Sequence, residues 1–361
     1  MKTIVNRHVL RAEPYVPGKP IAEVKRELGL KQVVKLASNE SPFAPSPKVL
    51  QAIAAEAKSL NRYPDGQCFY LRQELAKRLK VAPEQLIFGN GSDEIIVMAI
   101  RAFVEPGNEV VIAKPSFLIY EIAAKLAGAK IKAVPLRNFF YDLDNMKRAV
   151  TEKTKMIFIG NPDNPAGTYV THSEILDFLS NLRRDIIIFF DEAYFEYVLE
   201  KDYPDTLKLL SDYKNVIITR TFSKLYGLAG LRVGYGIADK EVVEILNRVR
   251  EPFNVNSVAQ AAALACLKDQ AYYQRVVRYT HKQKKIIYAA LEKLNLLFRE
   301  SAANFILLDV KRNSSEVARE MLKRGVIVRD MSPWGLRNFI RLTIGMENEN
   351  KRFLEVLKEV L

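Results

Sequence analysis

Cysteine, histidine and tryptophan are scarce in this chain of 361 residues, which has two cysteines, three histidines and one tryptophan. Two cysteines cannot build a disulfide framework, and this favours a reducing cytoplasm. The histidines, His8, His172 and His281, lie far apart and lack the spacing of metal ligands. None of them has the partners of a Ser-His-Asp arrangement. We therefore expect neither a metal site nor a serine hydrolase.

Long apolar runs are also missing. No run approaches the roughly 20 residues that a membrane-spanning helix needs. The first fifteen residues, MKTIVNRHVLRAEPY, lack the apolar centre of a signal peptide. We expect a soluble cytoplasmic protein with no membrane partner.

The formal net charge of +13 raises the question of a nucleic-acid partner. Lysine and arginine are spread along the whole chain and mixed with acidic residues. The densest basic runs, such as 281–285 (HKQKK), are short and lie within helical patterns. We expect a solvated basic surface that attracts anionic small molecules, and no nucleic acid.

Short apolar runs alternate with helical patterns through the first two thirds of the chain. Continuous apolar strands separated by helices are typical of a mostly parallel sheet that is buried on both faces. The fold class predicted is therefore α/β. The strands are expected at 85–88, 109–113, 130–134, 155–159, 185–190, 216–219 and 232–237.

The pattern changes near residue 250, where EPFNVN interrupts it. Long helices follow, and then alternating strands and helices that indicate a smaller α+β domain, which the N-terminal segment joins. The predicted parts are an arm at 1–44, a large domain at 45–250 and a small domain at 251–361. The later strands are expected at 305–310, 326–329 and 339–344, and helices include 21–28, 69–79, 119–127 and 271–294.

The stretch 219–236, TRTFSKLYGLAGLRVGYG, has Lys224 at its centre, just past a short apolar strand. Open α/β sheets hold their ligands at such strand ends. A fixed, partly desolvated lysine can form a Schiff base with an aldehyde. Arg232 brings a second cation to the same region. Since most lysines are surface residues, this stretch alone leaves catalysis open.

Three other loops also follow predicted strands. The first, 89–94 (GNGSDE), opens a helix and is suited to bind phosphate, although an ordinary helix cap explains it as well. The second, 161–167 (NPDNPAG), carries amides that could donate to a phenolate-like oxygen, or is simply a tight turn. The third, 191–194 (DEAY), places Asp191 at the end of a buried strand, where it needs a cation, a metal or a helix to cap.

Together these loops offer a phosphate cradle, a donor to a ring oxygen, a carboxylate for a ring nitrogen and a lysine for an aldehyde. Pyridoxal 5′-phosphate carries those four groups. Phe117, just past another strand, could stack on the ring face, or belong to the core.

The order NGSDE, NPDNPAG, DEAY, TFSK and GLAGLRVGY resembles the fold-type I aminotransferases of classes I and II. Further motifs, PYVPGKP, LASNESP, NRYPDG, VRD and RLTIG, resemble the histidinol-phosphate aminotransferase branch, and the likeness covers residues 14–345. The resemblance implies a mostly parallel seven-stranded sheet sandwiched by helices, pyridoxal 5′-phosphate as cofactor, and transamination between histidinol phosphate and 2-oxoglutarate. An aromatic amino-acid aminotransferase, a threonine-phosphate decarboxylase and a non-catalytic regulator that binds the cofactor stay open as alternatives.

The resemblance also implies residue roles. Lys224 binds the cofactor aldehyde and moves the proton, Asp191 pairs with the ring nitrogen, and Tyr194 and Asn164 bond the ring oxygen. The residues implied at the cofactor phosphate are Ser92, Asp93, Glu94, Thr221, Ser223 and Arg232, with Tyr63 from the neighbouring subunit of a homodimer. Those implied at the substrate are Tyr15, Asn39, Arg329 and Arg341.

This chain departs from the family pattern at three places: the arm LASNE, Phe117 where tyrosine is common, and Asp163 where asparagine is usual. None of these removes a group that the chemistry needs. They bear on substrate preference.

Overall fold

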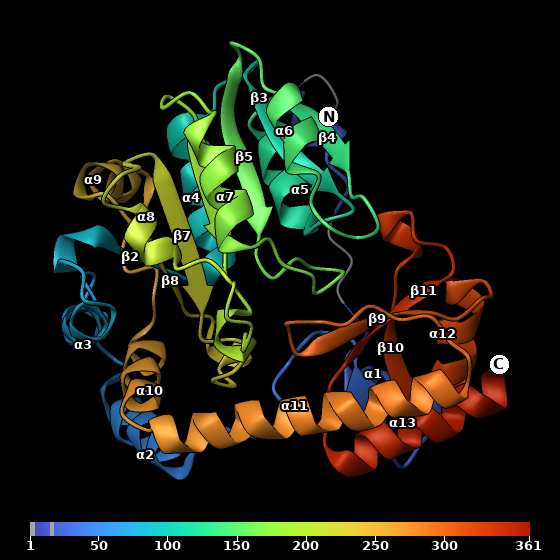
Figure 1. Cartoon of the computed structure of the whole chain (residues 1–361). Helices are drawn as coiled ribbons and strands as arrows, with labels where there is room; N and C mark the ends of the chain where they lie inside the picture. Colours follow the sequence, from blue (N-terminus) through green and yellow to red (C-terminus); the bar gives the residue numbers. More distant parts are fainter. Residues whose placement is uncertain (1–3, 15–17) are drawn as a thin grey trace.

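A sheet of seven strands forms the centre of the computed structural model, which describes residues 4–14 and 18–361 (Figure 1). The strand order is β2-β8-β7-β6-β5-β3-β4. Five neighbouring strands, from β7 to β4, run parallel, and β8 is antiparallel to both β7 and β2. The strands are β2 (Leu86–Gly89), β3 (Glu109–Lys114), β4 (Lys130–Pro135), β5 (Thr154–Gly160), β6 (Ile187–Asp191), β7 (Val216–Thr221) and β8 (Gly234–Ala238). The predicted mostly parallel seven-stranded sheet is confirmed.

Both faces of this sheet are buried, as continuous apolar strands require. Alternate side chains of a strand enter different cores: Ile157 and Ile159 of β5 lie in one, and Met156 and Phe158 lie in the other. Helices α3 (Phe69–Leu79), α7 (His172–Ser180) and α10 (Ser257–Leu267) cover the first face. Helices α4 (Ser92–Phe103), α5 (Leu118–Leu126) and α9 (Lys240–Val249) cover the second.

A second sheet of four strands has the order β1-β10-β11-β9. Its strands are β1 (Val34–Leu36), β9 (Phe305–Asp309), β10 (Val326–Asp330) and β11 (Phe339–Thr343). Apolar side chains of α11 (Gln270–Lys293), α12 (Ser314–Lys323) and α13 (Glu347–Val360) form its core. Because β1 pairs in parallel with β10, the N-terminal segment completes this sheet. The sequence pattern did not predict β1, which has only three residues.

The remaining helices are α1 (Ile21–Leu28), α2 (Pro47–Glu56), α6 (Leu143–Arg148) and α8 (Thr206–Leu209). Helices α1 and α3 have the predicted bounds, whereas the four residues of α8 were too short for a periodic signal. Helix α10 packs on α2 and α3, and the long α11 runs from there to α13 (Figure 1). The division at residue 250 therefore stays a prediction. Among the described residues, no helix is long and apolar enough to cross a membrane.

The two sheets face each other across the middle of the molecule. The arrowheads of β5 and β7 point toward that middle in Figure 1. The loops that follow these strands therefore meet residues of the smaller sheet, as is typical of ligand sites in open α/β sheets.

Candidate active site

A cavity of about 410 Å³ lies at the carboxyl ends of β5, β6 and β7. Its walls come from loops that are far apart in the sequence and from the smaller sheet. Of the residues predicted for the site, thirteen line it: Asn39, Ser92, Asp93, Phe117, Asn164, Asp191, Tyr194, Thr221, Ser223, Lys224, Arg232, Arg329 and Arg341.

Lys224 lies three residues after the end of β7, in a bend of the chain over residues 222–224. Its Nζ lies 3.4 Å from the carbonyl oxygen of Ser38 and 5.7 Å from the ring centre of Tyr194. Burial lowers the pKa of Lys224 to about 8, and the nearby Arg341 guanidinium acts in the same direction. A lysine with a lowered pKa is more often neutral near pH 7, and only the neutral amine is a nucleophile or a base.

Asp191 is the last residue of β6, and only 6% of it is exposed. Its Oδ2 accepts a hydrogen bond of 2.8 Å from the Tyr120 hydroxyl, and its Oδ1 accepts one of 3.2 Å from the Ala193 backbone N–H. Burial raises the pKa of Asp191 to about 6. This carboxyl group is thus arranged to gain from a cationic ligand in the cavity.

Two amides converge on the hydroxyl of Tyr194. Asn39 Nδ2 donates to it at 2.9 Å, and Asn164 Nδ2 does so at 3.5 Å. Asn164 Oδ1, the oxygen of the same amide, accepts a hydrogen bond from Arg341 Nη1. Arg341 Nη2 donates to the Ala37 carbonyl oxygen at 3.1 Å. The network joins the loop after β5 to β11 and to the segment after β1.

The N-terminus of α4 faces the same cavity through Ser92 and Asp93. Arg232 Nη2 donates to Asp93 Oδ1 at 2.7 Å, so a guanidinium is held beside the free N–H groups of the helix start. Gly91 precedes the helix with φ +87°, a conformation that favours glycine. Free N–H groups, the helix dipole and a guanidinium together favour an anion here.

Comparison with known proteins shows the family of the chain. The family model "Aminotransferase class I and II" matches residues 31–357. This chain belongs to the class I and II aminotransferases.

Curated relatives of this aminotransferase match it over nearly its full length. The histidinol-phosphate aminotransferase of Moorella thermoacetica is 47% identical over 354 residues, which cover 98% of this chain and 92% of the relative. That of Caldicellulosiruptor saccharolyticus is 44% identical over 356 residues, with 98% and 99% covered.

Solved structures also resemble this aminotransferase. The histidinol-phosphate aminotransferase of Sinorhizobium meliloti, crystallised with pyridoxal-5′-phosphate, has a TM-score of 0.89 and 29% identity over 98% of this chain and 96% of that one. The aspartate aminotransferase of Thermus thermophilus with maleate has a TM-score of 0.86 at 22% identity and 99% coverage of both chains, which shows the fold alone. The resemblance inferred from the motifs is confirmed at the level of family and fold.

Two of the described residues predicted for the site, Glu94 and Tyr63, are not among those that line the cavity. Glu94 Oε2 accepts from the Asn90 backbone N–H and from Asn254 Nδ2, both at 2.6 Å, so this carboxylate closes the loop before α4. Tyr63 is 82% exposed and stacks on Phe253 with ring centres 4.7 Å apart. Tyr15 lies outside the described residues.

Sequence reasoning missed two aromatic residues that line the cavity, Tyr120 and Trp334. Tyr120 lies within a predicted helix, where an aromatic residue at helical spacing indicates core packing. Trp334 follows β10 in a 3-10 helix of three residues, Ser332–Trp334, which is too short to carry a periodic signal. Only their tertiary contacts reveal a connection to the site.

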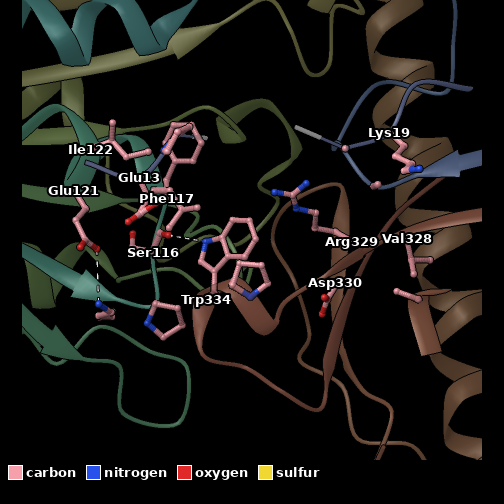
Figure 2. A pocket seen from close by; sticks show the side chains of 18 of the residues that line it. Glu13, Lys19, Ser116, Phe117, Glu121, Ile122, Val328, Arg329, Asp330 and Trp334 are labelled. Atoms are coloured by element: carbon pink, nitrogen blue, oxygen red, sulfur yellow. Dashed lines mark hydrogen bonds and ion pairs between the residues drawn. The ribbon is translucent and has the colours of Figure 1, made fainter. Parts of the chain in front are cut away.

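Trp334 stands between the active-site cavity and a larger outer cavity of about 710 Å³. Figure 2 shows the outer cavity, with the Trp334 indole next to Ser116 and Phe117 and the side chain of Arg329 close by. Trp334 Nε1 donates to the Ser116 carbonyl at 3.1 Å, and the Arg329 guanidinium lies 4.8 Å from the indole ring centre. Phe117, Arg329 and Trp334 line both cavities, so they form the wall between them.

Proposed function

We propose that this aminotransferase uses pyridoxal 5′-phosphate to convert histidinol phosphate and 2-oxoglutarate to imidazole-acetol phosphate and glutamate, a step of histidine biosynthesis. The observation that carries the proposal is the identity of 47% and 44% to two curated histidinol-phosphate aminotransferases over 98% of the chain. Relatives this similar over the full length support a common reaction, and the chemistry of the cavity agrees with it.

The side chains around the cavity fit each polar group of pyridoxal 5′-phosphate. The start of α4, with Arg232, suits the phosphate, and Lys224 suits the aldehyde. Asp191 suits the ring nitrogen, because a buried carboxyl with a raised pKa gains from a pyridinium cation. Asn164 and Tyr194 suit the ring oxygen. When bound, the pyridinium ring withdraws electrons from the substrate carbon that loses its proton.

Lys224 is the residue that we assign to proton transfer. Its pKa of about 8 lies near the working pH, where a general base and acid is most effective. When the cofactor is bound, the Lys224 amine would hold its aldehyde group, and the same amine would act as the base and acid that moves the substrate proton.

Arg329 and Arg341 are the residues that we assign to the substrate anions. The site must accept a phosphate monoester in one half of the reaction and a dicarboxylate in the other. A guanidinium pairs with two oxygens of either anion, so the same two side chains serve both. Asn39, bound to Tyr194, and Tyr15 complete the proposed substrate site.

We further propose a homodimer in which Tyr63 reaches the cofactor phosphate of the partner subunit. Tyr63 is exposed and does not line the cavity of its own chain, and other apolar side chains near it in the sequence are also exposed. These are Leu60, at 60%, Phe69, at 53%, and Tyr70, at 75%. A dimer would bury this surface.

Mixing two inactive variants tests the dimer. Lys224→Ala and Tyr63→Ala subunits would form one site that has Lys224 from one chain and Tyr63 from the other. We expect activity to reappear when the two proteins are mixed and allowed to exchange subunits. If Tyr63 served its own chain, no site in the mixture would be complete and activity would stay absent.

We also place the reaction in the cytoplasm, with small molecules as partners and without nucleic acid or membrane. Cys68 and Cys266 are both buried free thiols, which is typical of proteins in a reducing compartment. Among the described residues, no group of histidine, cysteine, aspartate or glutamate side chains could hold a metal ion.

The substrate is tested by one half of the reaction. Histidinol phosphate is added to the cofactor-loaded protein without 2-oxoglutarate, and the absorbance of the lysine-bound cofactor is followed as it converts to the amine form. We expect full conversion at low substrate concentration. Faster conversion with phenylalanine would assign the protein to aromatic amino-acid transamination instead, and release of carbon dioxide without any need for 2-oxoglutarate would assign it to decarboxylation.

A further inference from the structure

We propose that Tyr120 is a positioning residue for the cofactor, because its hydroxyl holds the Asp191 carboxylate in the orientation that meets the ring nitrogen. The proposal rests on pyridoxal 5′-phosphate being the cofactor. It does not depend on which amino compound is the substrate.

The geometry at Asp191 is the first support. The Tyr120 hydroxyl donates to Oδ2 at 2.8 Å, and the Ala193 backbone N–H donates to Oδ1 at 3.2 Å. One donor on each oxygen restrains the rotation of the carboxylate plane. Each oxygen keeps a further lone pair, which leaves the carboxylate able to accept from an N–H of a ligand in the cavity.

The packing of Tyr120 is the second support. Only 2% of the residue is exposed. Its ring stacks on that of Phe158, with the ring centres 4.5 Å apart and an angle of 7° between the planes. The rings of Tyr120 and Phe117 are T-shaped to each other, with their centres 5.6 Å apart. The same side chain therefore contacts both the carboxylate for the ring nitrogen and the aromatic residue proposed for the ring face. A side chain packed in this way is held in one rotamer and can fix its neighbours.

The charges around Asp191 are consistent with the Tyr120 hydroxyl acting as a hydrogen-bond donor to its carboxylate. Burial and the nearby Asp191 carboxylate raise the pKa of Tyr120 well above its ordinary value, so the hydroxyl keeps its proton and donates. The groups that act on Asp191 are Tyr120, the Ala193 N–H, Lys224 and, with opposite sign, Asp93. The hydrogen bond from Tyr120 lowers the pKa of Asp191 and so opposes the effect of burial.

The variant Tyr120→Phe removes this donor and keeps the ring. Tyr141→Phe is the matched control, because the Tyr141 hydroxyl also donates to a buried aspartate, Asp163, at 3.2 Å. Asp163 does not belong to the residues that line the cavity. Both variants lose a phenol hydroxyl and its hydrogen bond to a carboxyl group. Tyr141→Phe also loses the bond in which its hydroxyl accepts from the Gly160 backbone N–H at 2.8 Å, so it is the more disruptive change of the two, yet only Tyr120→Phe alters the group that faces the ring nitrogen.

The measurement is the dissociation constant of pyridoxal 5′-phosphate and of its 1-deaza analogue, in which carbon replaces the ring nitrogen. We expect Tyr120→Phe to bind pyridoxal 5′-phosphate about tenfold more weakly than the unchanged protein, and the deaza analogue with unchanged affinity. The absorbance of the bound cofactor should also titrate with a shifted midpoint. Tyr141→Phe should bind both compounds as the unchanged protein does.

Other outcomes would overturn the proposal. If Tyr120→Phe lost the same affinity for both compounds, Tyr120 would act only through packing. If it lost affinity for neither, Tyr120 would have no role in cofactor binding. If Tyr120→Phe does not fold, 3-fluorotyrosine at position 120 replaces it as the test. This residue keeps the shape and is a stronger donor, so it should tighten binding of pyridoxal 5′-phosphate alone. Failure of the unchanged protein to bind pyridoxal 5′-phosphate would reject the cofactor itself, and this inference with it.

Discussion

Lys224 and Asp191 share one partly closed cavity, and burial moves their pKa values in opposite directions. Burial disfavours whichever form is charged, so it lowers the pKa of the lysine to about 8 and raises that of the aspartate to about 6. Burial therefore increases the neutral fraction of the Lys224 amine near pH 7, while Asp191, with a pKa of about 6, is still mostly ionised at that pH. At the scale of single residues, desolvation is the main physical cause of both pKa shifts.

Replacing Lys224 with alanine should lower turnover by at least about 10³-fold, because the proton-transfer group and the covalent link to the cofactor are both lost. The measurement is steady-state turnover together with the absorbance of bound cofactor. Lys284→Met is the control. Lys284 is another buried lysine, with its pKa lowered to about 8, and it lies outside the active-site cavity. The control should keep its turnover, and a loss as large as that of Lys224→Ala would contradict the assignment.

Replacing Asp191 with asparagine should stabilise the cofactor-free protein at pH 7 while weakening cofactor binding. The pKa of Asp191 is raised from 3.8 to about 6 by folding. Its contribution to stability is therefore complete below about pH 4 and is lost as the pH rises to about 6, a loss of about 3 kcal/mol.

Urea unfolding of the cofactor-free forms at several pH values checks this prediction. The variant should gain over the unchanged protein between pH 4 and pH 6 and keep that gain at pH 7. An equal difference in stability at all of these pH values would show that the carboxyl group does not titrate as inferred.

At the scale of elements, the start of α4 can pack closely against β8 because Gly234 has no side chain. A Cβ on Gly234 would lie 2.5 Å from the Ser92 backbone nitrogen and 2.8 Å from the Gly91 carbonyl carbon. Both contacts are with backbone, which cannot rotate away. The close approach brings the N–H groups of α4 beside the loops that follow β6 and β7, and it is this juxtaposition that makes an anion site.

Replacing Gly234 with alanine should therefore displace the start of α4. We expect a loss of about 1–3 kcal/mol in the free energy of unfolding and weaker binding of pyridoxal 5′-phosphate. Gly230→Ala is the control, because no atom lies within 4 Å of a Cβ at that position. The two variants are compared by urea unfolding and cofactor titration. Equal behaviour would show that the close approach has no effect on the site.

At the scale of the whole molecule, the site depends on how the smaller sheet meets the larger one. Arg341 of β11 contacts Asn164 in the loop after β5, and Trp334, after β10, donates to Ser116 after β3. The N-terminal segment adds Asn39, which bonds Tyr194 and accepts the Asn304 side-chain amide at its carbonyl oxygen. The arginines that we propose for the substrate are thus carried by one sheet and the proposed cofactor site by the other.

Replacing Trp334 with phenylalanine should raise KM for the amino substrate about three- to tenfold and change kcat less. Phenylalanine keeps a ring beside Arg329 but loses the indole N–H that binds the Ser116 carbonyl, a bond worth about 1 kcal/mol. Steady-state kinetics with histidinol phosphate would measure the change. An unchanged KM would mean that the contact does not help to hold Arg329 and Phe117 around the substrate.

Much of this architecture was predictable because it depends on local patterns. The buried strands β3, β5, β6 and β7 contain short continuous apolar runs. Four motif loops follow strands that end at one edge of the sheet. By contrast, β1 and α8 are too short for periodicity, and Tyr120 and Trp334 are ordinary aromatic residues in sequence. Glu94 was predicted in the loop near the phosphate, and only the structure shows that its carboxylate accepts from the Asn90 backbone N–H and from Asn254 Nδ2.

The amino-acid sequence by itself determined the fold class, the family and the chemical groups available, because apolar periodicity and motif order are properties of the chain alone. Only the tertiary structure decided which of those groups share a cavity, how far desolvation moves the pKa values of Lys224 and Asp191, and which aromatic residues support them. Desolvation and hydrogen-bond geometry depend on atoms brought together from distant parts of the chain, and no local pattern records them.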